Sequence, residues 1–383
     1  MDSVRAGEGP GSRHERGLPA PRTCPRPSRG FGPMSVESAR MSDLDFLVPS
    51  ALVEPGLASE LLRDQSLPTL ERLVARSGIA TTFDVPSRAS PNAWQAVVFG
   101  LRAGADLACI NVAELWATAC GAGPSTAGRR FVAEPAHFKV ANDHLRLDDP
   151  AGLAVTLDEA RALASSIEPV LTDAGWRLAP IDAATMTHWM LTRHDGTPLS
   201  AATIERAIGD NVADWQPRGA DDAALAWRRC VNEIQMTWFA HPVNAAREAE
   251  GRPTINTLWL SGNGEPPGPL PRYRAVTSGL PLLAALPPTA DAPRVLESFD
   301  GFIGPARRED WSGWRAELQS LESRLAAVVA MQKQGAVATL TLILCGQSCA
   351  KLVTVRPGDA RKFWRDWSPG PSLALLFGEG RAA

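Results

Sequence analysis

The sequence predicts an α/β fold that carries a small inserted α+β domain. Short apolar runs alternate with amphipathic helical segments at both ends of the chain, which is typical of a mainly parallel sheet covered by helices. Between them, residues 131–215 alternate apolar and polar residues around turns, as expected of a separate α+β unit. Hydrophobic residues make up 44% of the 383 residues, which suffices for a core of this size.

Both ends of the chain are expected to lie outside this fold. Residues 1–40 are predicted to be a disordered tail, because they are rich in Gly, Pro and Arg and hold few large aliphatic side chains to offset the entropy of ordering. An alternative is that the protein starts at Met34 or Met41. A second tail is expected at residues 371–383.

The first part of the core domain is assigned to residues 41–130. Leu44–Pro49 is a short apolar run that fits a buried strand. The segment SLPTLERLVARSG places leucines at helical spacing, with Ser66 as a candidate N-cap. A further helix is expected after Ser90, since Pro91 would occupy its first helical position.

The inserted α+β domain is assigned to residues 131–215. Two stretches, HFKVANDHLRLDD and THWMLTRHDGTPLS, have the residue pattern of strands connected by turns. The segment TLDEARALASSIEPVLTDAG between them has the pattern of a capped amphipathic helix.

The second part of the core domain is assigned to residues 216–370. Its first helix carries Trp227, Ile234 and Trp238 on one face and ends at His241, because a residue before proline disfavours the helical conformation. The strand TINTLWL follows and leads into a Gly-x-Gly turn. A long helix, DWSGWRAELQSLESRLAAVVAMQKQG, then precedes AVATLTLILCG, the most strand-like run in the chain.

Charge and hydropathy argue against nucleic acid and membrane as partners. The net charge is −3 and the pI is near 6.1, so no general electrostatic attraction to polyanions is expected. The longest apolar run, Ala336–Cys345, is too short to span a bilayer. Six scattered cysteines suggest no disulfide framework, so a cytoplasmic protein is expected.

A candidate anion site lies around the Gly-x-Gly turn. Gly262 and Gly264 follow a predicted strand, and α/β sheets hold ligands at the carboxyl ends of their strands. His241, Asn244 and Arg247 lie just upstream and are expected to converge on the same crevice. In the competing structural interpretation, His241 only ends a helix and Arg247 pairs with Glu248 or Glu250.

Other motifs give weaker signals. Cys345 and Cys349 lack a second pair at ligand spacing, so buried thiols are favoured over a metal or redox site. The histidines of the inserted block form no H-E-x-x-H pattern, and neither a P-loop nor a G-x-S-x-G elbow occurs. The catalytic residues, if any, are therefore not identified.

The segment HPVNAAREAEGRPTINTLWLSGNG resembles the H-P-V-N-x-x-R-x-x-x-G…N-x-x-x-x-x-G-x-G motif of archaeal-type cofactor-independent phosphoglycerate mutases, which belong to the alkaline-phosphatase superfamily. Residues 41–370 also resemble the related bacterial RpfE-type regulatory proteins. The resemblance implies an alkaline-phosphatase-like three-layer α/β/α sandwich with an inserted domain. It also implies a substrate-binding set made of His241, Asn244, Arg247, Asn256, Gly262, Asn263 and Gly264.

The chain departs from the superfamily's metal and nucleophile pattern. The first strand ends in LVPS instead of Asp-Gly, and the late strand ends in Cys345-Gly346 instead of Asp-His. Trp314 stands where the resemblance places a histidine, and Ser261 stands where it places an arginine. A two-metal site needs several converging carboxylates and imidazoles, so no metal ligand is assigned. Either Ser87 or Ser90 aligns with the nucleophile.

Three functional hypotheses follow. The favoured one is a phosphoglycerate-mutase-like regulatory or ligand-binding protein that has lost its metal site, needs no cofactor, and binds a phospho-metabolite or a protein partner. The alternative is an active mutase or phosphatase that holds Mn or Zn with atypical ligands such as Asp45, His241 or Asp310. In the third, the segment around Asn244 and Arg247 is only a scaffold.

Overall fold

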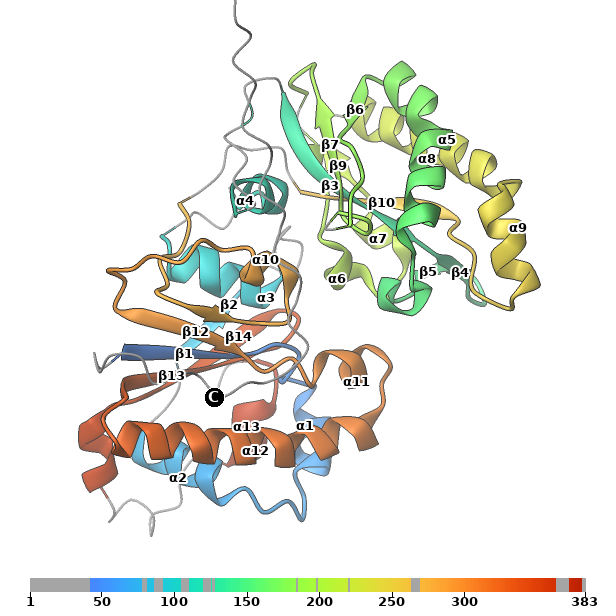
Figure 1. Cartoon of the computed structure of the whole chain (residues 1–383). Coiled ribbons are helices and arrows are strands. Elements are labelled where there is room, and N and C mark those ends of the chain that lie inside the picture. The colour runs from blue at the N-terminus through green and yellow to red at the C-terminus, as the bar shows by residue number, and fades with distance from the viewer. Residues whose placement is uncertain are drawn as a thin grey trace, which may run out of the picture.

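The computed structural model contains two lobes, shown in Figure 1. The core lobe comprises the described residues within 42–119 and 269–380, and the second lobe comprises those within 128–262. The predicted tail at residues 1–40 lies outside the described part of the chain. The structure describes residues 42–77, 81–85, 92–104, 110–119, 125, 128–183, 185–197, 199–219, 221–262, 269–362 and 372–380.

A six-stranded sheet forms the centre of the core lobe, in the order β11-β12-β1-β13-β14-β2. All its strands run in one direction except β14, which is antiparallel to both neighbours. Strand β1 is buried on both faces, which explains its continuous apolar run. The strands are β1 (Ser42–Val48), β2 (Thr81–Asp84), β11 (Val276–Thr277), β12 (Arg294–Ser298), β13 (Val337–Cys345) and β14 (Cys349–Val355).

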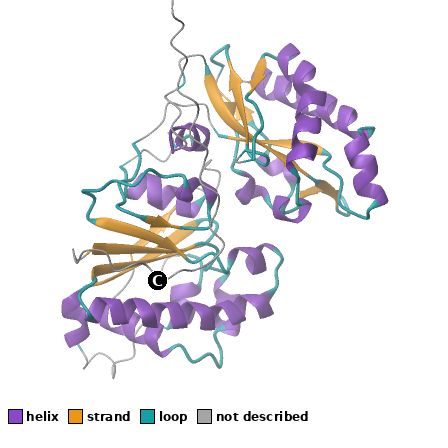
Figure 2. Cartoon of the chain, in the orientation of Figure 1, coloured by secondary structure: helices purple, strands orange, loops and turns teal. Residues whose placement is uncertain are grey.

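Helices cover both faces of this sheet (Figures 1 and 2). One face buries leucines at helical spacing from α12, which is the long helix that the sequence predicts. The helices on this face are α1 (Pro55–Leu61), α2 (Pro68–Ser77), α12 (Trp311–Lys333) and α13 (Leu373–Phe377). The other face is covered by α3 (Ala93–Gln95), the π-helical η1 (Ala96–Leu101), α4 (Val112–Ala119) and α10 (Pro281–Ala284). Helix α11 (Ile303–Arg307) and the 3₁₀ turn η4 (Pro357–Arg361) complete the lobe.

The C-terminal segment differs from the expected tail. Residues 372–380 carry α13, and Leu376 and Phe377 are buried in the core. The ring of Phe377 meets Trp314 edge to face, with 5.8 Å between the ring centroids. This short apolar helix is ordered by tertiary contacts that local sequence does not reveal.

The second lobe is built on an antiparallel sheet with the order β10-β3-β7-β6. Helices α5 and α8 pack together on one face of it, where Trp189 of the sheet contacts Trp238 of α8. Its main elements are β3 (Arg129–Ala136), α5 (Leu157–Asp173), β6 (Trp176–Leu178), β7 (Trp189–Arg193), α8 (Asp221–Phe239), α9 (Pro242–Ala249) and β10 (Thr257–Ser261).

The boundary of the second lobe lies later than the expected end of the inserted domain at residue 215. Helices α8 and α9 and strand β10, which were expected in the second part of the core domain, belong to the second lobe. The reason is the pairing of β10, whose Trp259 lies opposite Glu134 of β3 in antiparallel register. Strand–helix alternation alone does not distinguish a strand of the parallel sheet from a strand of a second sheet.

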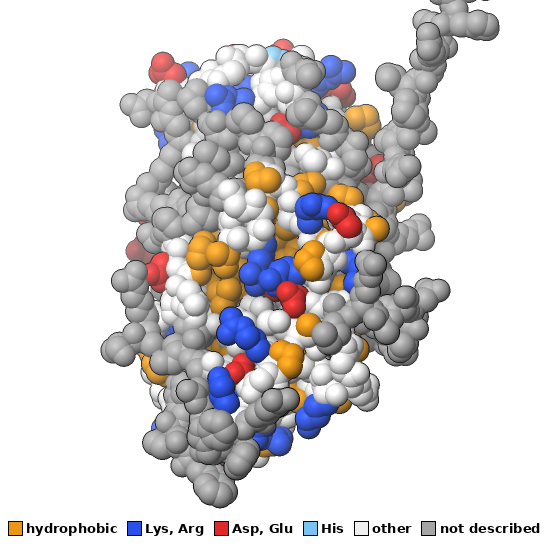
Figure 3. Space-filling model, turned by 90° about the vertical axis from the view of Figure 1, so that its left-hand side faces the viewer, with side chains coloured by type: hydrophobic (Ala, Val, Ile, Leu, Met, Phe, Trp, Pro, Cys, Tyr) orange, Lys and Arg blue, Asp and Glu red, His pale blue; other side chains and the backbone are white. Residues whose placement is uncertain are grey.

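Smaller elements cover the other face of the second sheet, around Trp259 and Ala136. They are β4 (Phe138–Val140), β5 (Leu145–Leu147), α6 (Ile204–Ala207) and α7 (Val212–Trp215). The turn η3 (Pro150–Leu153) and strand β8 (Leu199–Ser200) instead place Leu153 and Leu199 in the cluster on the α5 side, and β9 (Arg218–Gly219) pairs with β8. None of the helices in the described ranges is long and apolar enough to cross a membrane. On the face shown in Figure 3, basic side chains are interspersed with acidic and apolar ones.

Candidate functional site

His241 begins helix α9. Its backbone is extended, and its ring Nδ1 accepts a hydrogen bond from Val243 N at 3.2 Å. Burial lowers the pKa of His241, which keeps the ring neutral and able to accept this bond. The residue is therefore the N-cap of α9 at the sharp junction with α8, in agreement with the structural interpretation of His-Pro.

Asn244 is buried, with 2% of its surface exposed. Its Nδ2 donates to Trp238 O at 2.9 Å and to Ile255 O at 2.8 Å, and its Oδ1 accepts from Ile255 N at 2.8 Å. Both amide hydrogens are thus used by the backbone. The side chain fixes the end of α8 to the loop that precedes β10.

Arg247 has no exposed surface. Its Nε donates to Pro253 O at 2.7 Å, its Nη1 forms an ion pair with Glu159 Oε1 at 2.9 Å, and its Nη2 donates to Leu153 O. The expected pairing with an adjacent glutamate is replaced by a pairing with the first turn of α5. The guanidinium ties α9, the following loop, η3 and α5 together.

The rest of the predicted substrate-binding set is also engaged with the chain. Asn256 Nδ2 donates to Phe138 O at 2.9 Å, and its Oδ1 accepts from Phe138 N at 2.7 Å. Gly262 adopts φ +117°, and an added Cβ would lie 3.1 Å from Asn111 Oδ1. Asn263 and Gly264 lie outside the described residues.

The structure therefore does not bring these residues together around an open crevice. His241, Asn244 and Arg247 lie at α9, whereas Gly262 follows β10 at the boundary with α4 of the core lobe. The expectation that the Gly-x-Gly turn lies at the carboxyl edge of a parallel sheet is wrong, because β10 belongs to the antiparallel sheet.

Among the described residues, few metal-binding side chains lie at the carboxyl edge of the central sheet. Strand β1 ends before Pro49-Ser50, and β13 ends at Cys345. After β12, Asp300 accepts a hydrogen bond from Gly279 N at 2.8 Å, while its buried Oδ1 has no hydrogen-bond partner among the described residues, and burial raises its pKa. Within the described ranges, no three His, Cys, Asp or Glu side chains lie close enough to hold a metal. The donor set there does not fit a two-metal centre.

The atypical metal ligands considered from the sequence are far from forming one site. Asp45 lies within β1, where it accepts hydrogen bonds from Arg102, Arg294 and Tyr273. Asp310 is the N-cap of α12 and accepts from Gly313 N at 2.9 Å. His241 belongs to the second lobe. The candidate nucleophiles Ser87 and Ser90 lie outside the described residues.

Cys345 and Cys349 project to opposite faces of the central sheet. Cys345 pairs with Ala350 and packs with the cluster on the α3 side, whereas Cys349 packs with the cluster on the α12 side. Side chains of adjacent residues in a strand point to opposite faces, so Ala350 and Cys349 must diverge. Burial raises the pKa of both thiols, as expected of inert buried cysteines.

A polar cluster that no sequence motif predicts lies on the side of the second sheet that faces the core lobe. Glu134 Oε1 lies 3.4 Å from His188 Nε2, and Ser261 Oγ donates to Glu134 Oε2 at 3.4 Å. Trp116 of α4 stacks on the His188 ring with 5.3 Å between centroids. The only local indication of this cluster is the acidic Glu134 within the apolar segment RFVAEPA. Which side chains lie beside Glu134 depends on the register of the paired strands, which the local sequence does not specify.

Burial sets the protonation of this cluster. It raises the pKa of Glu134 well above its ordinary value, and the nearby Glu205 adds to this shift, while Arg307 of the core lobe opposes it. Burial lowers the pKa of His188 to about 4, so the ring is neutral at neutral pH. A carboxyl group and an imidazole with oppositely shifted pKa values are typical of a functional site.

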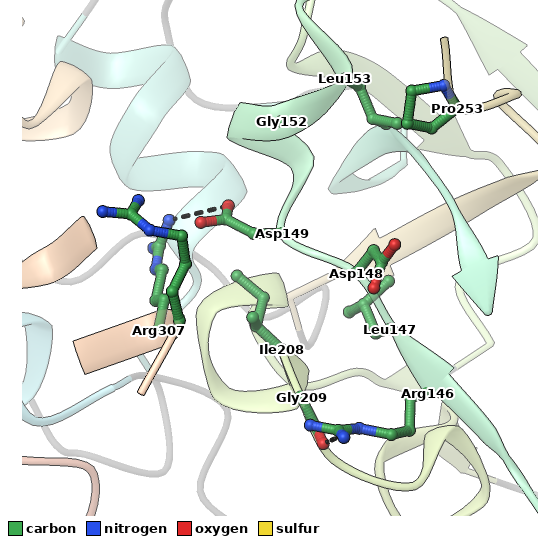
Figure 4. A pocket seen from close by; sticks show the side chains of 11 residues that line it. Arg146, Leu147, Asp148, Asp149, Gly152, Leu153, Ile208, Gly209, Pro253 and Arg307 are labelled. Atoms are coloured by element: carbon green, nitrogen blue, oxygen red, sulfur yellow. Dashed lines mark hydrogen bonds and ion pairs between the residues drawn. The ribbon is translucent and has the colours of Figure 1, made fainter. Parts of the chain in front are cut away.

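A separate hollow of about 280 Å³ is lined by residues of both lobes (Figure 4). Arg307 Nη1 forms an ion pair with Asp149 Oδ1 across it at 3.2 Å. Arg146 Nε donates to Gly209 O at its other side. We call it the interlobe pocket; its charged lining consists of Arg146, Asp148 and Asp149 from the second lobe and Arg307 and Arg308 from the core lobe.

Comparisons with known proteins give structural similarity at low identity. No family model and no curated protein matches the sequence. The PH0037 protein from Pyrococcus horikoshii is 14% identical, with a TM-score of 0.49 over 83% of this chain and 88% of that one. The cofactor-independent phosphoglycerate mutase from Thermoplasma acidophilum DSM 1728 is 15% identical, with a TM-score of 0.39 over 83% of this chain and 90% of that one.

Proposed function

We propose that the protein is a metal-depleted, phosphoglycerate-mutase-like member of the alkaline-phosphatase superfamily that binds a small phosphorylated or carboxylated metabolite in the interlobe pocket. The observation that carries the proposal is the convergence of Arg146, Arg307 and Arg308 from both lobes on one hollow. A ligand that contacts both lobes stabilises one arrangement of the lobes, and a regulatory protein can signal ligand binding through that change of arrangement.

The charge of the pocket favours an anion. Three arginines against two aspartates leave one positive charge in excess. Arg308 forms no ion pair with the described residues, and Arg146 uses only its Nε for a backbone carbonyl, so guanidinium nitrogens remain for a ligand. Arginine binds phosphate and carboxylate in a bidentate manner, which makes it well suited to this task.

The size of the pocket favours a small metabolite. Its volume of 280 Å³ lies just below the range of about 300–1,000 Å³ that is usual for ligand sites. Phosphoryl transfer is not part of the proposal, because the side chains described at the carboxyl edge of the central sheet do not supply the ligands that two divalent ions require.

The direct test is calorimetric titration with 3-phosphoglycerate, phosphoenolpyruvate and inorganic phosphate. The double variant Arg146→Ala/Arg308→Ala should weaken binding at least tenfold, whereas Arg229→Ala, on the exposed side of α8, should leave it unchanged. Absence of binding by the wild type, or equal binding by the double variant, would refute the proposal. A mutase assay with added Mn and Zn on the same sample should show no turnover.

A further inference from the structure

The turn between β13 and β14 holds a carboxylate from the C-terminal segment. Glu379 Oε1 accepts hydrogen bonds from the backbone N–H groups of Gln347 and Ser348, the latter at 3.1 Å. Gly346 makes room for it, because a Cβ at this position would collide with the same oxygen. Two consecutive backbone N–H groups that point at one oxygen form an anion-binding nest.

The nest lies at the carboxyl end of a strand in the central sheet. Ligands of α/β sheets bind at this edge. The carboxylate of Glu379 also interacts with the charge of Arg206, which belongs to α6 of the second lobe. A carboxylate oxygen and a phosphate oxygen accept the same hydrogen bonds, so the position suits either anion.

The segment that carries Glu379 is held by contacts that do not involve its carboxylate. Val53 N donates to Phe377 O at 2.9 Å, and Glu379 N donates to Val53 O at 2.6 Å. Lys351 Nζ donates to Gly378 O at 2.6 Å and also to Leu375 O. The Glu379 side chain is only half-buried, so it can leave the nest while its backbone stays in place.

We propose that the N–H groups of Gln347 and Ser348, beside Gly346, form an oxyanion-binding site, and that Glu379 is its tethered internal occupant. A free phosphate or carboxylate group must displace the Glu379 side chain to bind there. A short tether gives an intramolecular competitor an effective concentration in the millimolar range or above. The site is separate from the interlobe pocket and does not depend on the function proposed for it.

The test follows the amide signals of Gln347 and Ser348 in ¹⁵N-labelled protein during titration with inorganic phosphate. In Glu379→Ala we expect saturable shifts of both signals, with an affinity at least roughly tenfold above that of the wild type. Adding Arg146→Ala and Arg308→Ala to this variant should leave the shifts in place, which separates the nest from the interlobe pocket.

Three outcomes would overturn the proposal. The first is a folded Glu379→Ala protein in which neither amide signal responds to phosphate. The second is an equal response in the wild type. The third is a response that disappears with the two arginines, which would assign the phosphate to the interlobe pocket. If Glu379→Ala does not fold, Glu379→Gln serves instead, because a neutral amide competes less well and should also raise the apparent affinity for phosphate.

Discussion

Replacing Arg247 with alanine distinguishes a scaffold from a binding residue. The guanidinium is fully buried and donates to Pro253 O at 2.7 Å, to Glu159 Oε1 at 2.9 Å and to Leu153 O. The substitution leaves the carbonyl groups of Pro253 and Leu153 without this donor inside the second lobe, and it removes one of the two arginines that pair with Glu159. Removing one partner of a buried ion pair costs about 3–5 kcal/mol, and we expect a loss of unfolding free energy in this range.

Arg252 provides a matched control. It forms an ion pair with the same Glu159 Oε1 at 3.1 Å, but 32% of its side chain is exposed. Water can therefore replace its contacts, and Arg252→Ala should change the unfolding free energy far less than Arg247→Ala. Urea denaturation followed by the fluorescence of buried tryptophans such as Trp189 and Trp238 measures both changes.

The pH dependence gives a second check on the same pair. Burial raises the pKa of Glu159, but hydrogen bonds from Thr156 N and Arg247 outweigh it, so the pKa is lower than its ordinary value of 4.5. The pair therefore stabilises the fold above pH 4.5 and loses this contribution as the pH falls below it. If Arg247→Ala were as mild as Arg252→Ala and abolished ligand binding instead, the scaffold assignment would be wrong.

Three further predictions concern buried groups. The raised pKa of Glu134 favours its protonated form in the folded protein, so folding stability falls as the pH rises through that pKa. Glu134→Gln should therefore raise the melting temperature more at pH 8 than at pH 5. An equal effect at both pH values would contradict this. Asp300→Asn should raise the melting temperature at pH 7, since it removes a buried carboxyl with an unpartnered oxygen, whereas Asp291→Asn on the surface serves as the control. Phe377→Ala should lower the free energy of unfolding, measured by urea denaturation, by about 3–5 kcal/mol. A negligible decrease would show that the C-terminal segment is a tail that does not stabilise the core.

Local patterns predicted several elements well. The segment TLDE begins α5, where Thr156 and Glu159 form a capping box, and the long helix expected at DWSGWRAELQSLESRLAAVVAMQKQG is α12. The apolar runs at β1 and β13 form neighbouring central strands. Each of these signals is contained within one segment, so the sequence reveals it without knowledge of the fold.

Helix ends that depend on distant residues escaped prediction. The first turn of α2 is capped by Glu322 of α12, whose Oε1 accepts from Thr69 N across 253 residues of sequence, and not by Ser66. A local cap was also placed wrongly: α3 begins at Ala93, and its N-cap is Asn92, which forms a capping box with Gln95 and lies two residues after the expected Ser90. Any nearby oxygen can satisfy the free N–H groups of a helix start, so tertiary neighbours decide which one does.

Local sequence patterns suffice to predict that strands and helices alternate along the chain and that a helix ends at His241-Pro242. Tertiary structure decided that β10 pairs with β3, that Arg247 binds Glu159, and that Glu134 lies beside His188. The physical reason is that periodicity and capping act over a few residues, whereas strand pairing and buried ion pairs join segments whose register no local pattern specifies.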